Sequence, residues 1–132
     1  MISMNEIFNE ITANGGATPS RKVREIAERF PEKIAFRNKE FGIWHEVTYE
    51  DFWNQTQFIG HALKYYGVDV KDKVAIHSEN RPEWIIADIA IQAIQSITVG
   101  LYPTNPPSEV KYLLGHSESK ILFAEDQEHV DK

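Results

Sequence analysis

The chain has 132 residues, a formal net charge of −6 and a pI near 5.3, and 42% of its residues are hydrophobic. This acidic balance argues against a nucleic-acid partner, which requires clustered Lys and Arg. The absence of cysteine excludes disulfides and thiolate catalysis. No apolar run approaches the ~20 residues of a membrane span, and the start of the chain lacks a signal-peptide pattern, so we expect a cytoplasmic location.

The first predicted element is a short helix that follows a lead-in. We expect residues 1–19 to be loosely ordered, because ANGGATPS is typical of a loop. From Ser20 onward, apolar residues recur at helical spacing as far as Pro31, which disfavours helix in the residue before it. These apolar residues are Val23, Ile26, Ala27 and Phe30.

A hairpin and a longer helix are predicted next. Residues 33–37 and 43–47 are β-prone, and they flank a turn at 38–42 that contains a glycine tolerant of positive φ. Thr48 then supplies a hydroxyl N-cap with an acidic residue three positions later, and Gly67 supplies a stop. The helix between them has one core-facing stripe, formed by Phe52, Thr56, Ile59, Leu63 and Tyr66.

The second half of the chain predicts a βαβαβ unit. Residues 74–77, 97–101 and 120–124 are short apolar runs, separated by helical segments that open with Pro82 and Pro107. Such runs are typical of parallel strands, which lie covered on both faces and need crossover helices. We therefore expect an α/β fold, in which a parallel βαβαβ sheet unit is preceded by an antiparallel hairpin and helices.

The carboxyl ends of the parallel strands are the candidate ligand site. Open α/β sheets bind ligands there, because strand ends and helix N-termini converge at that edge. HSEN, residues 77–80, follows the first strand, and Tyr102, Thr104 and Asn105 follow the second. A purely structural interpretation is favoured, in which the Ser and Asn of HSEN cap the next helix and Tyr102 packs beneath a loop.

The other polar side chains carry no assigned chemistry. No phosphate-binding glycine loop follows any strand. Five histidines fall on different elements and are interpreted as surface or capping residues: His45, His61, His77, His116 and His129. Glu50 and Asp51 are interpreted as helix-start charge, and Glu125 and Asp126 as a solvated tail. Trp84 is interpreted as a core anchor. We therefore assign no catalytic, cofactor-binding or metal-binding residue.

Several stretches of the chain, taken in order, resemble one known family. SENRPEW, IADIAIQA and VGLYPTNPPSEVKYLLGHSESKILFAED, with the hairpin and TYEDFW, are similar in order and spacing to the front end of the AMP-forming acyl-CoA synthetases, and most of all to the long-chain fatty acid branch. The resemblance runs from Pro31 to Asp126. Two positions depart from it, because Lys71 stands where the family usually has Gly, and Gln95-Ser96 where a Gly-containing helix exit is common.

The resemblance implies that residues 1–132 are a single, incomplete N-terminal subdomain, the first part of a larger adenylate-forming domain. Such ligases activate a fatty acid with ATP and Mg to an acyl-adenylate and transfer it to coenzyme A. The motifs for this chemistry do not occur in the chain, so we expect it to bind none of these cofactors and to be inactive alone. Its expected partner is the remainder of the same polypeptide, and its uncovered apolar surface predicts self-association. Some members contact membranes, but no residue of the sequence points to that property.

A free-standing, flavodoxin-like binding or interaction module is the alternative function. A complete domain of that kind should end after a covered strand or helix. The final residues, EDQEHVDK, instead stop at the predicted start of a helix, which favours the interpretation as a scaffold segment of a ligase.

Overall fold

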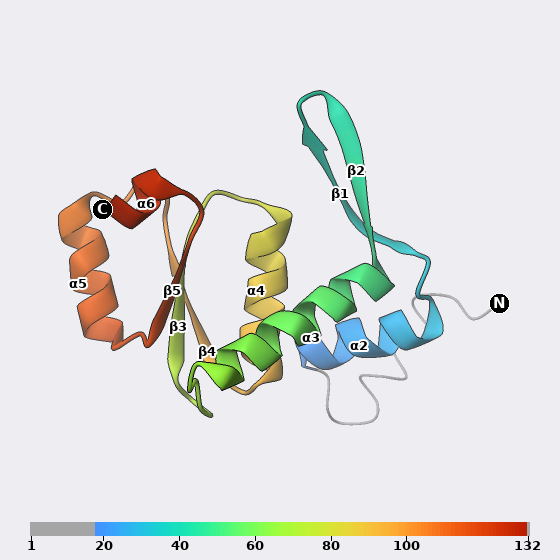
Figure 1. The fold of residues 1–132 in the computed structure, drawn as a ribbon, viewed down its shortest axis with the longest axis horizontal. Coiled ribbons are helices and arrows are strands. Elements are labelled where there is room, and N and C mark those ends of the chain that lie inside the picture. The colour runs from blue at the N-terminus through green and yellow to red at the C-terminus, as the bar shows by residue number, and fades with distance from the viewer. Residues whose placement is uncertain (1–17, 132) are drawn as a thin grey trace. The chain divides into compact units, whose positions relative to one another are not determined.

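The computed structural model describes residues 18–131 of the chain (Figure 1). The chain divides into two compact units, Met1–Gln57 and Phe58–Lys132. Most of the expected lead-in, 1–19, lies outside the described residues. Within the described part, no helix has the length and apolar character needed to cross a bilayer.

Helix α2 (Pro19–Arg29) is the first described element of the first unit. The hydroxyl of Thr18 accepts a hydrogen bond from the backbone N–H of Arg21 at 3.3 Å. Proline occupies the first turn, where a missing N–H leaves no partner unsatisfied. An exposed ion pair one turn apart, Arg21–Glu25 at 3.1 Å, adds local support. The helix is the one predicted, but it starts one residue before Ser20.

Strands β1 (Ile34–Glu40) and β2 (Ile43–Thr48) form the predicted antiparallel hairpin. The predicted turn at 38–42 is too long, because the last residue of β1 pairs with the first residue of β2. Only Phe41 and Gly42 connect the strands, with φ values of +49° and +80°. Two successive positive φ values are typical of a type I′ turn, whose twist matches that of paired strands, so pairing continues to the end of each strand.

Helix α3 (Tyr49–Tyr65) begins directly after the hairpin. The Thr48 hydroxyl accepts a hydrogen bond from the backbone N–H of Asp51 at 3.1 Å, which confirms the predicted cap. Three members of the predicted stripe are buried, namely Phe52, Thr56 and Leu63. Tyr66 is 74% exposed, so its assignment to the stripe is wrong. The helix ends before Tyr66, and Gly67 then turns the chain away with φ +87°.

A three-stranded parallel sheet forms the centre of the second unit, with the order β4-β3-β5. Its strands are β3 (Lys73–His77), β4 (Ile97–Leu101) and β5 (Ile121–Ala124). Its helices are α4 (Pro82–Ala93), α5 (Pro107–Ser117) and α6 (Gln127–Asp131). The predicted α/β fold with a parallel βαβαβ unit is confirmed.

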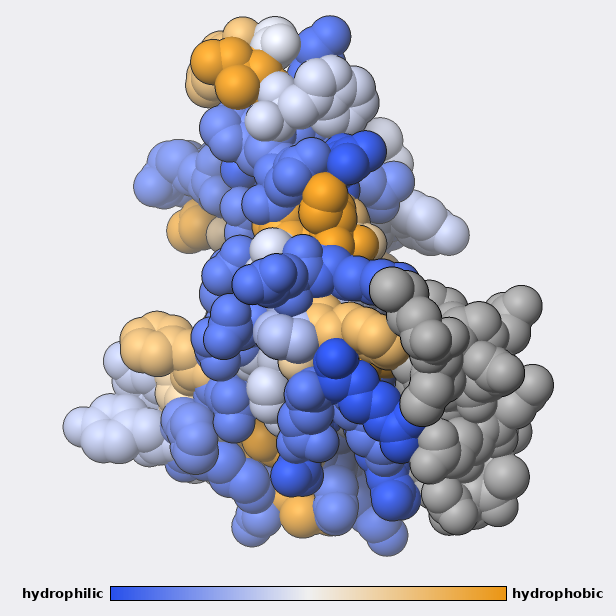
Figure 2. All heavy atoms as spheres, turned by 90° about the vertical axis from the view of Figure 1, so that its right-hand side faces the viewer, coloured by the Kyte–Doolittle hydropathy of each residue, from blue (hydrophilic) through white to orange (hydrophobic). Residues whose placement is uncertain are grey.

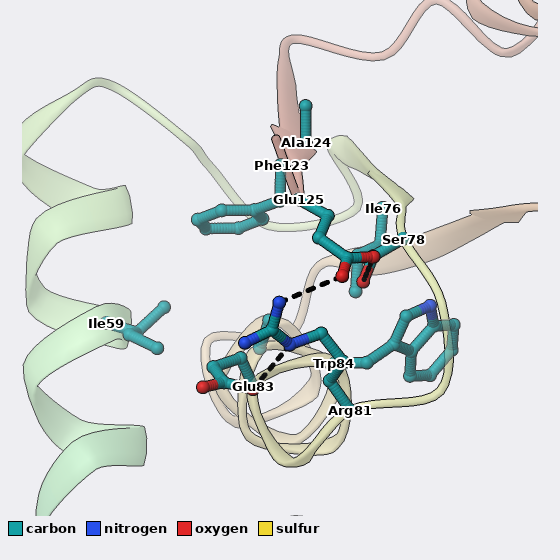
Figure 3. A pocket seen from close by; sticks show the side chains of 10 residues that line it. Ile59, Ile76, Ser78, Arg81, Glu83, Trp84, Phe123, Ala124 and Glu125 are labelled. Carbon is teal, nitrogen blue, oxygen red and sulfur yellow. Dashed lines mark hydrogen bonds and ion pairs between the residues drawn. The ribbon is translucent and has the colours of Figure 1, made fainter. Parts of the chain in front are cut away.

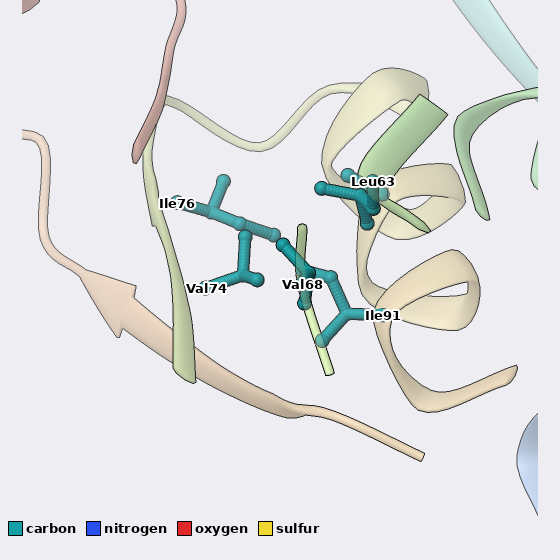
Figure 4. Close-up of a cluster of buried hydrophobic side chains, with 6 residues drawn as sticks. Leu63, Val68, Val74, Ile76 and Ile91 are labelled. Atoms are coloured by element: carbon teal, nitrogen blue, oxygen red, sulfur yellow. The ribbon is translucent and has the colours of Figure 1, made fainter. Parts of the chain in front are cut away.

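Alternate residues of β3 contribute to two separate cores. Val74 and Ile76 pack against side chains from α3, α4 and the chain between α3 and β3 (Figure 4), namely Leu63, Val68, Ala87 and Ile91. Ala75 belongs to a second cluster, with Leu101 and Val110. Successive side chains of a strand point to opposite faces, so β3 is covered on both sides, as parallel strands require.

Two turns next to the sheet have left-handed backbone at residues other than glycine. Lys71 has φ +66° and Gln95 has φ +63°. The backbone N–H of Lys71 donates to the carbonyl of Gln95 at 2.9 Å, so the two turns are joined. These are the positions at which the sequence departs from the glycines of the family that it resembles. Lys71 and Gln95 therefore adopt the left-handed conformation that glycine favours, although both are larger residues.

We expect Gln95→Gly to raise the free energy of unfolding by about 0.5–1 kcal/mol, because relief of left-handed strain exceeds the added entropy of the unfolded chain. Urea unfolding midpoints measure the difference. The matched control is Gln92→Gly, which lies inside α4 and should lower stability by about 1 kcal/mol. Equal losses in the two variants would contradict the assignment of strain to Gln95.

Candidate functional site

A cavity of about 350 Å³ lies at the carboxyl ends of β3 and β5 (Figure 3). Its walls are mainly apolar, and the charged side chains of Arg81, Glu83 and Glu125 lie close to one another and form its polar side. The apolar lining consists of Ile59, Ile76, Trp84, Ala87, Phe123 and Ala124. The polar lining consists of Ser78, Arg81, Glu83 and Glu125. This is the sheet edge at which the sequence placed a candidate ligand site.

The carboxylate of Glu125 is the centre of the polar side. It accepts a hydrogen bond from the backbone N–H of Glu79 at 2.8 Å and one from the Ser78 hydroxyl at 3.2 Å. The guanidinium of Arg81 donates to its other oxygen at 2.8 Å. Only 14% of the Glu125 side chain is exposed. One carboxylate at the end of β5 therefore fixes the loop that follows β3.

The charges on this side compensate one another only in part. The backbone N–H of Glu79, followed by the guanidinium of Arg81, lowers the pKa of Glu125 below its usual range. The hydrogen bond to Glu125 and the nearby charge of Glu83 raise the pKa of Arg81. Glu83 lies 3.4 Å from the Arg81 guanidinium, so one cation stands between two anions. A bound phosphate would have to compete with both carboxylates for Arg81.

The expected capping of α4 by the Ser and Asn of HSEN is wrong. Arg81 occupies the N-cap position, and no side chain makes the cap hydrogen bond. The Ser78 hydroxyl instead donates to Glu125 and to the carbonyl of Glu79. Glu125, directly after the neighbouring strand, accepts hydrogen bonds from the Ser78 hydroxyl and from the backbone N–H of Glu79, so the Ser78 hydroxyl is engaged away from the helix.

A second cavity, of about 290 Å³, lies on the β4 side of the same edge. Its lining includes Ser78, Asn80, Trp84, Gly100 and Tyr102. Trp84 contributes to both cavities and also packs against the core cluster of α3 and α4. Tyr102 is 77% exposed, so its expected place beneath a loop is wrong. The strand end leaves it beside the cavity instead.

Two of the histidines are buried, contrary to their interpretation as surface or capping residues. His77 is completely buried at the end of β3, and its ring meets that of His129 with 4.6 Å between centroids. His129 lies on α6, and its Nδ1 is 2.7 Å from Asp126. The central strand is covered by α6 at this point, which buries its last residue. His45, His61 and His116 are exposed.

The paired carboxylates at the end of β5 have different environments. Asp126 is exposed, as expected for a solvated tail, and it also accepts a hydrogen bond from the backbone N–H of His129 at 3.1 Å at the start of α6. Glu125 is largely buried, so its interpretation as part of a solvated tail is wrong. Its partners are 44 to 47 positions away in the sequence, and strand pairing brings them close.

The remaining predicted residues lie away from the two cavities. The side-chain amide of Asn105 donates to Glu109 at 2.6 Å near the start of α5, and Thr104 is exposed. Sequence reasoning missed Arg81 and Glu125. The signal for Glu125 was its place directly after a parallel strand, which is the rule that selected HSEN. In residues 18–131, no group of three or more His, Asp or Glu could hold a metal ion.

We expect Glu125→Gln to lower the free energy of unfolding by about 1–3 kcal/mol at neutral pH, because charged hydrogen bonds to the loop are lost. Urea unfolding measures the change. Glu83→Gln is the matched control, because that side chain is 69% exposed and its loss should cost at most about 0.5 kcal/mol. A Glu125→Gln variant as stable as the control would contradict the role of Glu125.

The difference between the native protein and Glu125→Gln should also depend on pH. The pKa of Glu125 is lowered in the folded state. The unfolded chain therefore binds this proton at a higher pH than the folded one does, and the stabilisation is complete only above the unfolded value of about 4.3. We expect the difference in urea midpoint to shrink as the pH falls through the lowered folded value. A difference that grows in acid would contradict this.

Comparisons with known proteins identify the family of this chain. A family model described as AMP-binding enzyme matches residues 23–132. The chain is 35% identical over 99 residues to long-chain-fatty-acid–CoA ligase FadD15 of Mycobacterium bovis, covering 75% of this chain and 16% of that protein. It is 34% identical over 86 residues to peroxisomal long chain acyl-CoA synthetase 7 of Arabidopsis thaliana, covering 65% of this chain and 12% of that one. The chain thus spans about a sixth or less of these curated relatives.

Solved structures show the same fold at lower identity. A fatty acyl-adenylate ligase from L. pneumophila has a TM-score of 0.77 at 19% identity, with 85% of this chain and 20% of that chain covered. The N-terminal subdomain of Klebsiella oxytoca NpsA has a TM-score of 0.72 at 23% identity, with 83% and 28% covered. Since the family model matches well over half of the chain, the chain belongs to the family of AMP-binding enzymes.

Proposed function

We propose that this chain is the first part of the N-terminal domain of an AMP-forming long-chain fatty acid–CoA ligase. The observation that carries the proposal is its 35% identity with a long-chain-fatty-acid–CoA ligase over three quarters of its length. The whole enzyme would activate a fatty acid with ATP to an acyl-adenylate, release pyrophosphate, and transfer the acyl group to coenzyme A. Residues 1–132 form one incomplete subdomain in this proposal. A free-standing, flavodoxin-like module is disfavoured by the family match.

The role proposed for this chain is to build and hold a sheet edge. Glu125 keeps the loop after β3 in place through Ser78, Glu79 and Arg81. Apolar side chains line most of the cavity beside it. Such a preorganised edge supports a ligand pocket completed by the rest of the polypeptide, which is the proposed partner of this chain.

The cofactors implied by this activity are ATP, Mg and coenzyme A. The described residues do not fit their phosphates or the metal. Arg81 is already engaged by two carboxylates, and no group of three or more acidic or histidine side chains in the described part could hold a metal ion. We therefore assign no cofactor-binding or catalytic residue to this chain. The absence of cysteine supports the proposed cytoplasmic location, and the net charge of −6 gives no support to a nucleic-acid partner.

The proposal is tested by replacing the matched segment of M. bovis FadD15 with the corresponding segment of this chain. We expect the chimaera to catalyse fatty-acid-dependent exchange of pyrophosphate into ATP, while the 132-residue chain alone catalyses none. Omission of the fatty acid is the control. The proposal would be contradicted by a folded chimaera that catalyses no pyrophosphate exchange, or by pyrophosphate exchange with the 132-residue chain alone.

We also expect the 132-residue chain to self-associate. Large apolar side chains of the second unit are exposed, among them Phe58 at 78%, Tyr65 at 86% and Val130 at 61%. Exposed apolar patches beyond a few hundred Å² tend to drive association. Sedimentation velocity at increasing concentration measures it. A strictly monomeric profile at high concentration would contradict the prediction that this exposed apolar surface drives association.

A further inference from the structure

Two histidine rings meet inside the second unit, between the end of β3 and helix α6. Hydrophilic side chains cover much of the face of the molecule in Figure 2, where water hydrates them. His77 is completely buried instead, and His129 is only 7% exposed. Their rings lie edge to face, with 4.6 Å between centroids and 79° between planes. Two side chains that gain a proton near neutral pH are therefore in contact away from water.

Helix α6 depends on this contact for its place on the sheet. Its one buried residue is His129. The hydrogen bonds from the backbone N–H groups of His129 and Val130 both go to Asp126, at 3.1 Å each, and so lie within the segment itself. A helix of five residues is too short to persist in water without tertiary packing. The contact with His77 supplies that packing.

One exposed carboxylate lies beside the two rings. Asp126 is 2.7 Å from Nδ1 of His129, and 55% of its side chain is exposed. The hydrogen bond from the His129 ring, followed by the one from its backbone N–H, lowers the pKa of Asp126. Because an ionised carboxylate only accepts hydrogen bonds, Nδ1 of His129 carries a proton. Asp126 can therefore balance one positive charge, and its contact places that charge on His129.

The surroundings of His77 are mainly apolar. The neighbouring strands meet it in register with Leu101 on β4 and Ala124 on β5. The ionisable side chains of α5, and the remaining ones of α6, are exposed, namely Glu109, Lys111, Tyr112, His116, Glu128 and Asp131. The carboxylate of Glu125 is engaged by the loop after β3. A charge on His77 would thus enter a buried site, which disfavours the charged form of a histidine.

We propose that the contact between His77 and His129 is a pH-sensitive switch that holds α6 on β3 at neutral pH and releases it in mild acid. The first proton goes to His129, where Asp126 balances it. A second would put a charge on buried His77 beside the first. Once α6 leaves, both rings reach water, where an imidazole gains a proton near a pH of about 6.5. Proton uptake therefore favours release, and the docking equilibrium constant falls up to about tenfold for each pH unit below that value.

The switch is linked to the cavity at the sheet edge. The backbone N–H of Glu125 donates to the carbonyl of His77 at 3.2 Å, and Asp126 directly follows Glu125. Ser78, the residue after His77, lines both cavities. The proposed release of α6 therefore begins one residue away from the carboxylate that fixes the loop after β3.

Hydrogen exchange measured by NMR on the 132-residue chain tests the switch. The Val130 amide donates to the carbonyl of Asp126, so its protection factor reports on α6. We expect this protection factor to fall about tenfold between about pH 7.5 and pH 5.5, while the amides of β3 keep theirs. The lowered pKa values of Glu125 and Asp126 keep both carboxylates ionised across this range, so their titration contributes nothing to the change.

The decisive variant is His77→Phe, which keeps an aromatic ring against His129 but gains no proton. We expect its Val130 protection factor to be the same at both pH values. His61→Gln is the matched control, because it removes an exposed histidine from α3 and should keep the native pH dependence. The ring resonances of His77 give a second measurement, since they should titrate with the same midpoint as the loss of protection.

An unchanged Val130 protection factor in the native chain would overturn the inference, and so would an equal loss of protection in His77→Phe. If His77→Phe does not fold, the ring titration decides, because protonation of His77 while α6 stays protected also overturns the switch. The measurements use neither fatty acid nor ATP. A failure of the proposed ligase activity therefore leaves their outcome unaffected.

Discussion

The carboxylate of Glu125 is the interaction on which the sheet edge depends. Moving a carboxylate out of water is expensive unless donors replace the lost hydration. Here the backbone N–H of Glu79, the hydroxyl of Ser78 and the guanidinium of Arg81 supply those donors. Because they belong to the loop after β3, the same bonds that satisfy the carboxylate also set the position of the loop. The guanidinium of Arg81 offsets one of the two carboxylate charges at the cavity, and the rest of the lining is mainly apolar.

The apolar wall of the cavity depends on the close approach of the Trp84 ring to strand β4. A Cβ atom placed on Gly100 would lie 3.3 Å from Cζ2 of Trp84, tighter than most real contacts. Glycine at this position lets the indole rest against the strand while it also contacts the core of α3 and α4. Trp84 therefore connects the two cavities to the sheet. Its interpretation as a core anchor describes only part of this environment.

The sequence predicts the parallel sheet well because the signal is local. The runs at β3, β4 and β5 are mainly apolar, and each helix between them begins with proline. The polar edge is predicted poorly because its contacts are not local. Glu125 meets residues from a different strand end, and His77 is buried by a helix far along the chain. No pattern within a dozen residues contains that information, whereas the rule about strand ends would have pointed to Glu125 had it been applied to β5.

Backbone irregularity alone does not mark function in this protein. Lys71 and Gln95 have left-handed φ values like that of Phe41, yet their exposed side chains are polar, and a backbone hydrogen bond joins their turns. Their conformation follows from how the chain enters and leaves the sheet. At Phe41 the turn would form more readily with Asn, and the apolar ring faces solvent. Phe41 differs from Lys71 and Gln95 because its exposed side chain is apolar. A contact outside the chain would bury this ring and recover the free energy lost by exposing it, whereas the turn itself does not bury it.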